Sequence, residues 1–205
     1  PHTTSAMNSY LRKAEMRNTD WFDELFSTGI MQQHSVSISS GTNKTTSYIS
    51  LSIMDDPGWY KRSNVQRYTA RANSSIRIFE NFTLDLRSSA SYRNQKAPGT
   101  MKQEVSTVYG EVKRNFDINP FNYSMNTSRT LSADEYHTRN YTDFNIHEEL
   151  KNNYIELKVI DASFQGQVTY KPIKDLSLKA LGALKYSSNS MQWHVKEKSN
   201  AAGAY

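Results

Sequence analysis

The chain contains no cysteine and has few of the residues that usually fill a protein core. Among 205 residues, the absence of cysteine excludes a disulfide framework and thiolate metal sites, although it says little about the compartment. Hydrophobic residues make up only 37% and the mean hydropathy is -0.74. Aromatic residues nevertheless reach 12%, with 13 tyrosines, and so many rings argue against a disordered chain.

No apolar run approaches the ~20 residues that a membrane-spanning helix needs, so a membrane role would have to come from strands. Residues 1–4 also lack a basic segment followed by an apolar stretch. No signal peptide is therefore visible, and we expect either a mature chain or a piece of a longer one. The net charge of +5 would permit nucleic-acid binding. The basic residues are scattered, however, without a basic run or an RNA-binding aromatic motif, and we predict no nucleic-acid partner.

Two neighbouring runs between Asn64 and Gln95 alternate apolar with polar residues, and only Phe79, Glu80 and Asn81 join them. Such runs predict a long hairpin with one apolar and one strongly polar face. This pattern is typical of a membrane β-barrel wall with lipid outside and water inside. It is also compatible with a soluble antiparallel sheet that buries one face. In the barrel interpretation the lumen-facing charges are Arg71, Arg77, Asp85, Arg87 and Arg93.

Strands before and after this hairpin follow the same alternation. We expect them at residues 33–40, 46–54, 155–171 and 176–186. A short helical lead-in at residues 5–16 and a capped turn from Asp20 come first, and a long irregular segment covers roughly residues 96–153. The connections therefore run short, long, short, very long, short. Outer-membrane barrels alternate short periplasmic turns with long extracellular loops in this way.

Several runs in the first third of the chain carry a family likeness. They are NTDWFDELF at 18–26, QQHSVSISSGTNKTT at 32–46, YISLS at 48–52 and RYTARAN at 67–73. In this order and spacing they resemble the early barrel of the SusC/RagA family of TonB-dependent outer-membrane transporters. The sequence departs from the family pattern at residues 39–41, where a Gly pair is usual, and at Ile53, where an aromatic residue is common.

The resemblance implies a fold that composition alone does not give. We expect an all-β chain, namely an antiparallel transmembrane β-barrel segment of about six up-and-down strands from a barrel of about 22 strands with an N-terminal plug. Residues 1–30 would be the end of an extracellular loop with short helical turns. Residues 31–205 would be barrel strands with a long extracellular loop at about 96–153. An open wall has two unpaired edges, so we expect no transport activity from this part alone.

The resemblance also implies a function and partners. Family members import oligosaccharides or peptides across the outer membrane of Gram-negative, Bacteroidetes-type bacteria. They work with a SusD-like surface lipoprotein and draw energy from the TonB complex, and their barrels contact outer-membrane lipid. The alternative that the residues leave open is a soluble secreted all-β carbohydrate-binding module. That alternative predicts a sheet with both faces covered by protein.

Side chains with catalytic potential have simpler explanations in this sequence. Asp55 and Asp56 precede a Pro-Gly pair, and we interpret them as turn caps rather than as an acid/base or calcium pair. His137 and His147 have a separation that matches no zinc pattern. No nucleophile-elbow motif is present. We therefore predict no enzyme activity, no metal and no cofactor.

Aromatic residues in the expected loops are the candidates for ligand or partner contact, because flat rings bury much area at low entropic cost. They are Trp59, Tyr60, Tyr109, Phe121, Tyr123, Tyr136 and Tyr141. Packing of the loops on themselves would explain these rings equally well. For the lumen-side charges, a solute path or plug contact competes with pairing across neighbouring strands, which is the simpler interpretation.

Overall fold

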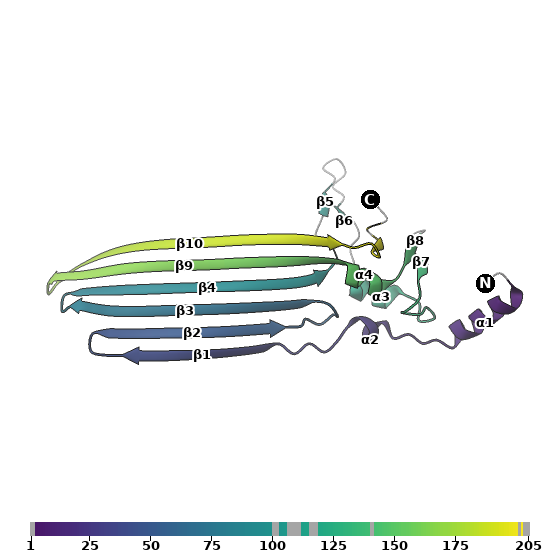
Figure 1. Ribbon diagram of the computed structural model, residues 1–205, viewed down its shortest axis with the longest axis horizontal. Coiled ribbons are helices and arrows are strands. Elements are labelled where there is room, and N and C mark those ends of the chain that lie inside the picture. The colour runs from purple at the N-terminus through teal and green to yellow at the C-terminus, as the bar shows by residue number, and fades with distance from the viewer. Residues whose placement is uncertain are drawn as a thin grey trace.

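The computed structural model describes residues 3–99, 103–105, 112–114, 119–139, 142–200 and 202. Its main feature is one long antiparallel sheet with the strand order β1-β2-β3-β4-β9-β10 (Figure 1). The strands are β1 (Gln32–Gly41), β2 (Thr45–Asp56), β3 (Asn64–Phe79), β4 (Phe82–Pro98), β9 (Asn153–Ile173) and β10 (Leu176–Val195). Each strand pairs with the next of the six along the chain, so the predicted up-and-down antiparallel arrangement is confirmed.

The tight turns all lie at one end of this sheet and the long connections at the other (Figure 1). Residues 80–81 join β3 to β4, and residues 174–175 join β9 to β10. The third tight turn is fixed by Thr42, whose Oγ1 accepts the Thr45 backbone N–H at 3.1 Å. We call these two ends of the sheet the hairpin end and the loop end.

The loop end carries four helices and two small hairpins. The helices are α1 (Thr4–Glu15), α2 (Trp21–Leu25), α3 (Pro120–Asn126) and α4 (Ile146–Asn152), and the hairpins pair β5 (Gln103–Val105) with β6 (Val112–Arg114) and β7 (His137–Arg139) with β8 (Thr142–Phe144). Side chains of Asp20, Asn119 and Asn145 cap α2, α3 and α4 by accepting backbone N–H groups. Among the residues that the structure describes, no helix is both long and apolar enough to cross a membrane.

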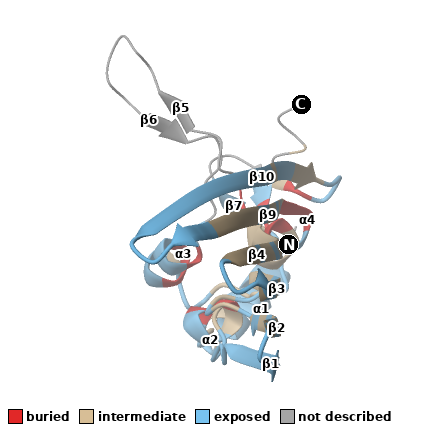
Figure 2. Cartoon of the chain, turned by 90° about the vertical axis from the view of Figure 1, so that its left-hand side faces the viewer, coloured by how far each residue is buried: buried red, intermediate tan, exposed pale blue. Residues whose placement is uncertain are grey.

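The buried core lies among these helices and not on the sheet. Its cluster consists of Trp21, Leu25, Tyr123, Phe144, Ile146 and Leu150. Figure 2 shows the same distribution, with buried residues in α2, α3, α4 and the adjoining end of β9 and with exposed or half-buried residues along the strands. Residues about 100 positions apart in the chain thus form one packed unit at the loop end.

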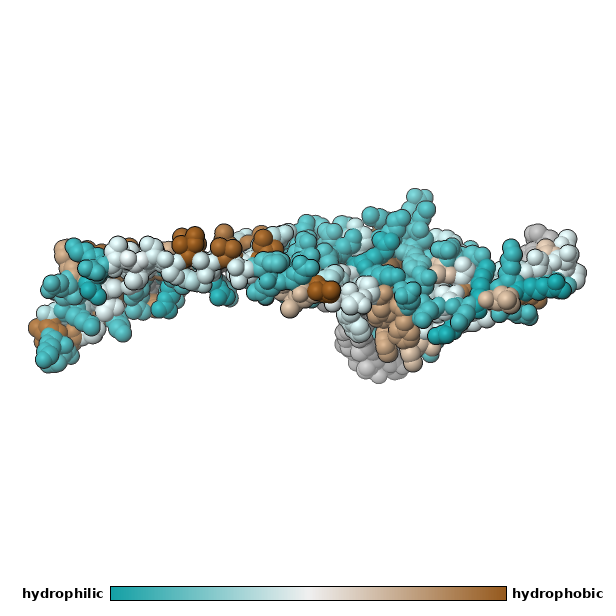
Figure 3. All heavy atoms as spheres, turned by 90° about the horizontal axis from the view of Figure 1, so that it is seen from below, coloured by the Kyte–Doolittle hydropathy of each residue, from teal (hydrophilic) through white to brown (hydrophobic). Residues whose placement is uncertain are grey.

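The two faces of the sheet differ sharply in chemistry. The register aligns Val36, Leu51, Ala70, Ala90, Ala162 and Tyr186 in one row across all six strands. A neighbouring row on the same face runs from Ile38 to Leu184, and those side chains are 67% and 75% exposed. Seen from the β1 side, apolar atoms protrude from one side of the sheet between the hairpin end and the loops (Figure 3).

This apolar face is bounded by aromatic pairs. At the loop end the rings of Tyr68 and Tyr92 stack at 6.3 Å between centroids, and at the hairpin end Phe82 and Tyr170 lie 6.3 Å apart. Phe82 and Tyr92 are ten residues apart on β4, which is about 33 Å along a strand. At a strand tilt of about 40° this becomes about 25 Å, the height of the apolar band of outer-membrane barrels. We call the surface between these aromatic pairs the apolar band.

In the described part of the chain, α4 packs against β4 and β9 at the loop end, whereas along the apolar band side chains such as Ile38, Phe164 and Leu184 stay exposed. A soluble module would bury an apolar band of this size. The covered sheet that the soluble alternative requires is therefore not found among the residues that the structure describes.

Candidate functional site

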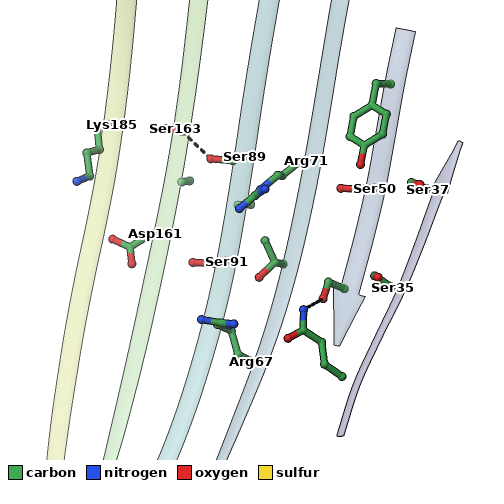
Figure 4. A pocket seen from close by; sticks show the side chains of 16 residues that line it. Ser35, Ser37, Ser50, Arg67, Arg71, Ser89, Ser91, Asp161, Ser163 and Lys185 are labelled. Atoms are coloured by element: carbon green, nitrogen blue, oxygen red, sulfur yellow. Dashed lines mark hydrogen bonds between the residues drawn. The ribbon is translucent and has the colours of Figure 1, made fainter. Parts of the chain in front are cut away.

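The polar face of the sheet is rich in hydroxyl groups. One row across it consists of Ser37, Ser50, Arg71, Ser89, Ser163 and Lys185. The next row towards the loop end consists of Ser35, Ser52, Thr69, Ser91, Asp161 and Ser187. Small side chains in these rows leave a hollow of about 630 Å³, whose lining also includes Arg67 (Figure 4). We call it the polar-face hollow.

Hydrogen bonds inside the polar-face hollow join neighbouring strands. The hydroxyls of Ser89 and Ser163 lie 2.8 Å apart, and the Ser187 hydroxyl donates to Asp161 Oδ1 at 2.7 Å. Arg67 and Arg71 extend from β3 over β4 towards Ser91 and Ser89 (Figure 4). The hollow therefore offers guanidinium and hydroxyl donors on one open surface.

The five charges predicted to face the lumen all stand at polar-face register positions. Arg71 pairs across strands with Ser50 and Ser89, Arg87 with Asn73 and Gln165, and Arg77 with Thr83. Asp85 lies opposite Ser75 and Gln167, and Arg93 lies opposite Arg67 and Val159.

No ion pair joins any of these five side chains to another described residue. The simpler interpretation, cross-strand charge pairing, is therefore not supported in the described part of the chain. The physical reason is the register, which places hydroxyls, amides, a valine or a second arginine opposite each charge and never a carboxylate.

Three of the predicted contact aromatics belong to one exposed cluster at the loop end. The Phe26 ring lies 5.7 Å from Trp59 and 6.5 Å from Phe121, and Trp59 lies 6.0 Å from Tyr60. Phe22 completes the cluster, stacking on Phe26 at 5.5 Å and meeting Phe121 at 5.8 Å. Trp59 is 63% exposed and Phe121 is 51% exposed. We call these five rings the loop-end aromatic cluster.

Backbone contacts fix the loop-end aromatic cluster by joining segments that are distant in sequence. The Ser27 N–H donates to the Trp59 carbonyl at 3.0 Å, and the Lys61 N–H donates to the Leu25 carbonyl at 2.8 Å. A side-chain carbon at Gly29 would come within 2.2 Å of the Gly58 carbonyl oxygen, so only glycine permits this approach. The ring positions are thus set by the backbone rather than by flexible tips.

Tyr123 has a different environment from the surface rings. It is 4% exposed, and its ring meets Trp21 edge-on at 5.2 Å. Burial raises the pKa of Tyr123 to about 12, although the Thr127 hydrogen bond and the Arg139 charge act the other way. Its hydroxyl lies 3.4 Å from Nε2 of His137, whose pKa is lowered by burial and by the Arg139 charge. Tyr123 supports the loop core from within.

The other predicted contact aromatics are separate from the cluster. Tyr136 is 53% exposed, and no ring contact is found for it within the described residues. Tyr109 and Tyr141 lie outside the described residues.

Polar contacts tie the N-terminal segment to the loop of residues 119–152. Arg17 makes two hydrogen bonds to the Glu135 carboxylate, at 2.9 and 3.2 Å. Nε2 of His147 lies 3.2 Å from Glu24 Oε2. The described residues contain no group of three or more His, Asp or Glu side chains placed to hold a metal ion.

Comparison with characterised proteins gives three relatives among TonB-dependent receptors. TonB-dependent receptor SusC of Bacteroides thetaiotaomicron is 41% identical over 63 residues, covering 31% of this chain and 6% of that protein. Receptors P3 and P26 of Formosa agariphila are 28% identical over 95 residues and 30% identical over 79 residues. The match to P3 covers 46% of this chain and 10% of P3. The match to P26 covers 38% of this chain and 8% of P26. No protein-family model matches the chain.

Solved structures of the RagAB peptide importer share the fold. Its closed-closed state superposes with a TM-score of 0.65 and 20% identity, covering 87% of this chain and 20% of that one. Its open-open state gives a TM-score of 0.62 and 24% identity, covering 85% and 19%. The resemblance to SusC/RagA TonB-dependent transporters is confirmed. The SusC/RagA likeness identifies the six strands as a segment of a transmembrane β-barrel, and the curated relatives are receptors rather than enzymes.

Sequence reasoning missed three residues of these surfaces, namely Phe22 and Phe26 of the loop-end aromatic cluster and Arg67 of the polar-face hollow. Phe22 and Phe26 occur in the run that carried the family likeness; Phe22 lies in α2 and Phe26 caps its end, and a spacing of four residues at a helical turn brings such rings to one side. Arg67 stands two positions before Thr69 in the alternating strand, so the period of two already assigned it to the polar face.

Proposed function

We propose that this chain is part of the barrel wall of a SusC/RagA-like TonB-dependent transporter in the outer membrane of a Bacteroidetes-type bacterium. The whole protein would import oligosaccharides or peptides together with a SusD-like surface lipoprotein, using energy from the TonB complex. The chain spans only 6 to 10% of the length of its curated relatives. Activity therefore belongs to the complete protein.

The observation that carries the proposal is the apolar band. Its side chains are exposed or half-buried in a layer that runs across six strands, and aromatic pairs bound it at both ends. Lipid is the solvent that such a surface requires, since every backbone group inside the sheet is already paired.

The position of the long connections supports an orientation. All tight turns lie at the hairpin end, and the four helices lie at the loop end. In outer-membrane barrels the long connections are extracellular. The proposal therefore assigns residues 1–30 and 96–153 to the outer surface and the polar face to the lumen.

The loop-end aromatic cluster is the proposed contact surface for a partner or a substrate. Trp59 and Phe121 are more than half exposed, Tyr60 is half-buried beside Trp59, and backbone bonds hold the segment of Trp59 and Tyr60 in place. Rigid rings of this kind suit stacking on sugar faces or packing against a partner protein. Tyr123 would contribute by holding α3, which carries Phe121, in place.

Membrane fractionation and uptake test the proposal on the complete parent protein. We expect the protein in the outer-membrane fraction, and a band shift on heating in detergent as the barrel unfolds. Deleting its gene should stop growth on one class of oligosaccharide or peptide, and restoring the gene should recover that growth. Recovery of the protein in a soluble secreted fraction would instead favour the carbohydrate-binding module.

A further inference from the structure

The polar face carries far more positive than negative charge. Between the row of Arg77 and the row of Arg67, its basic residues are Arg67, Arg71, Arg77, Arg87, Arg93, Lys179 and Lys185. Its acidic residues in the same rows are Asp85 and Asp161. Seven cations against two carboxylates leave an excess of five positive charges on one face of a single sheet.

This excess is concentrated beside the polar-face hollow. Arg67 and Arg93 are direct cross-strand partners, an arrangement of like charges that destabilises a sheet unless something compensates it. Nε of Arg93 is shielded from solvent and has no hydrogen-bond partner among the described residues. Asp161, the carboxylate that lines the hollow, already accepts the Ser187 hydroxyl.

The donors in the hollow are suited to oxyanions. A guanidinium presents N–H groups in a planar fork that matches a carboxylate, and serine hydroxyls can donate to the remaining oxygens. Arg67 and Arg71 are four residues apart on β3, which is about 13 Å along a strand. A ligand with acid groups at a similar spacing, as in an acidic oligomer, can meet both arginines at once. The hollow of about 630 Å³ lies within the range of small-molecule sites.

We propose that the polar-face hollow binds a solute with two or more carboxylates, such as an acidic oligosaccharide or an acidic peptide, through Arg67, Arg71 and Lys185. The inference rests on the proposed function, since it narrows the transported substrate to an anionic one. Ser89, Ser91 and Ser163 lie between these cations and supply neutral donors to the same ligand.

Calorimetric titration of the complete, detergent-purified parent protein tests this proposal. The probes are trigalacturonate and triglutamate, and their methyl esters serve as uncharged controls. We expect at least one acid to bind at about 50 mM salt, with no binding of its ester and strong weakening at about 500 mM salt. The R67Q/R71Q double variant should bind about a hundredfold more weakly, about tenfold for each arginine. K171Q/K174Q removes the same charge at the hairpin end, outside the rows counted above, and should leave the affinity unchanged.

Two further measurements keep the result decisive. R67K/R71K retains both charges without the planar fork, and its affinity for the acid should fall about tenfold. This variant takes the place of R67Q/R71Q in the test if R67Q/R71Q fails to fold. Equal affinity of R67Q/R71Q and the wild type would overturn the proposal, and so would a wild type that binds neither acid. If the wild type binds neither acid, a lower melting temperature of R67Q/R71Q than of K171Q/K174Q would assign the counter-charge to acidic side chains of the protein itself. The titration needs no uptake, so its failure would leave the transporter proposal standing.

Discussion

Leu25 and Leu184 are two leucines in opposite surroundings. Leu25 in α2 is 0% exposed, within a core of aromatic and aliphatic side chains, whereas Leu184 on β10 is 75% exposed in the apolar band. The loop end therefore hides its apolar surface inside the protein, as soluble proteins do. The sheet presents its apolar surface outward, and a bilayer is the medium in which that surface is stable. The loop end is thus stabilised by burying apolar side chains inside the protein, and the sheet by presenting them outward. Single substitutions can test each of the two regions.

Removing the central ring of the loop core should have the largest effect. Trp21 is 2% exposed, and its indole N–H donates to the Ser128 carbonyl at 3.0 Å. Trp21→Ala should cost about 3–5 kcal/mol of loop stability, since a cavity and an unpaired carbonyl remain. Hydrogen exchange on the complete protein should show faster exchange in α2, α3 and α4. Exchange in the middle of β4 and β9 should stay slow, and faster exchange there would mean that the two regions are not separate.

A charge in the middle of the apolar band should act on the sheet instead. Leu184 lies in the row of Ser88, inside the apolar band between the rows of Phe82 and Tyr92. Leu184→Arg should destabilise the barrel by about 2–4 kcal/mol, because the bilayer midplane excludes a charge at about that cost. Urea unfolding in lipid vesicles measures it. Leu181→Arg on the polar face of the same strand is the matched control and should cost far less, and equal losses would contradict a lipid-facing band.

High pH should unfold the loop end before the sheet. Burial raises the pKa of Tyr123 to about 12 in the folded protein, against 10.0 for the free side chain. The folded state therefore holds the proton more tightly, so its advantage is complete below pH 10 and is lost as the pH rises from 10 to about 12. The loss approaches about 3 kcal/mol at about 1.4 kcal/mol per pKa unit. Tyr123→Phe should abolish this pH dependence, as measured by hydrogen exchange of α3 across that interval.

The sheet could be predicted from the sequence because its signal is local. Alternation of apolar and polar residues identifies a strand within six residues. The lengths of the five connections then follow from the bounds of the strands. The end of β10 could not be located, because residues 187–190 are polar on both faces and are strand only through pairing with β9. Caps at Asn119 and Asn145 were available as signals for α3 and α4, but both helices have only seven residues.

The loop core could not be predicted, because its contacts join distant segments. Nothing near Tyr123 indicates that Trp21 will lie against its ring, and exposed and buried tyrosines have the same sequence signature. This is why one predicted surface aromatic lies in the core while Phe22 and Phe26 were passed over. Contacts of long sequence separation decide which rings of a loop reach the surface.

The smallest expected effect concerns the ion pair that ties the segment after α1 to the loop core. Arg17 and Glu135 form a bidentate pair at 2.9 and 3.2 Å, but the Glu135 side chain is 53% exposed, so water and salt screen the attraction. Glu135→Gln should cost less than about 1 kcal/mol and should release α1 without disturbing α2, because Thr19 is held independently by the Leu131 carbonyl at 2.6 Å. Limited proteolysis should show faster cleavage between α1 and α2 at low salt and no difference at high salt. A matched Asp134→Asn variant, one residue away and outside this pair, should cleave as the wild type does. If both variants behave alike, the Arg17 contact contributes nothing, and the loop core ends at Thr19.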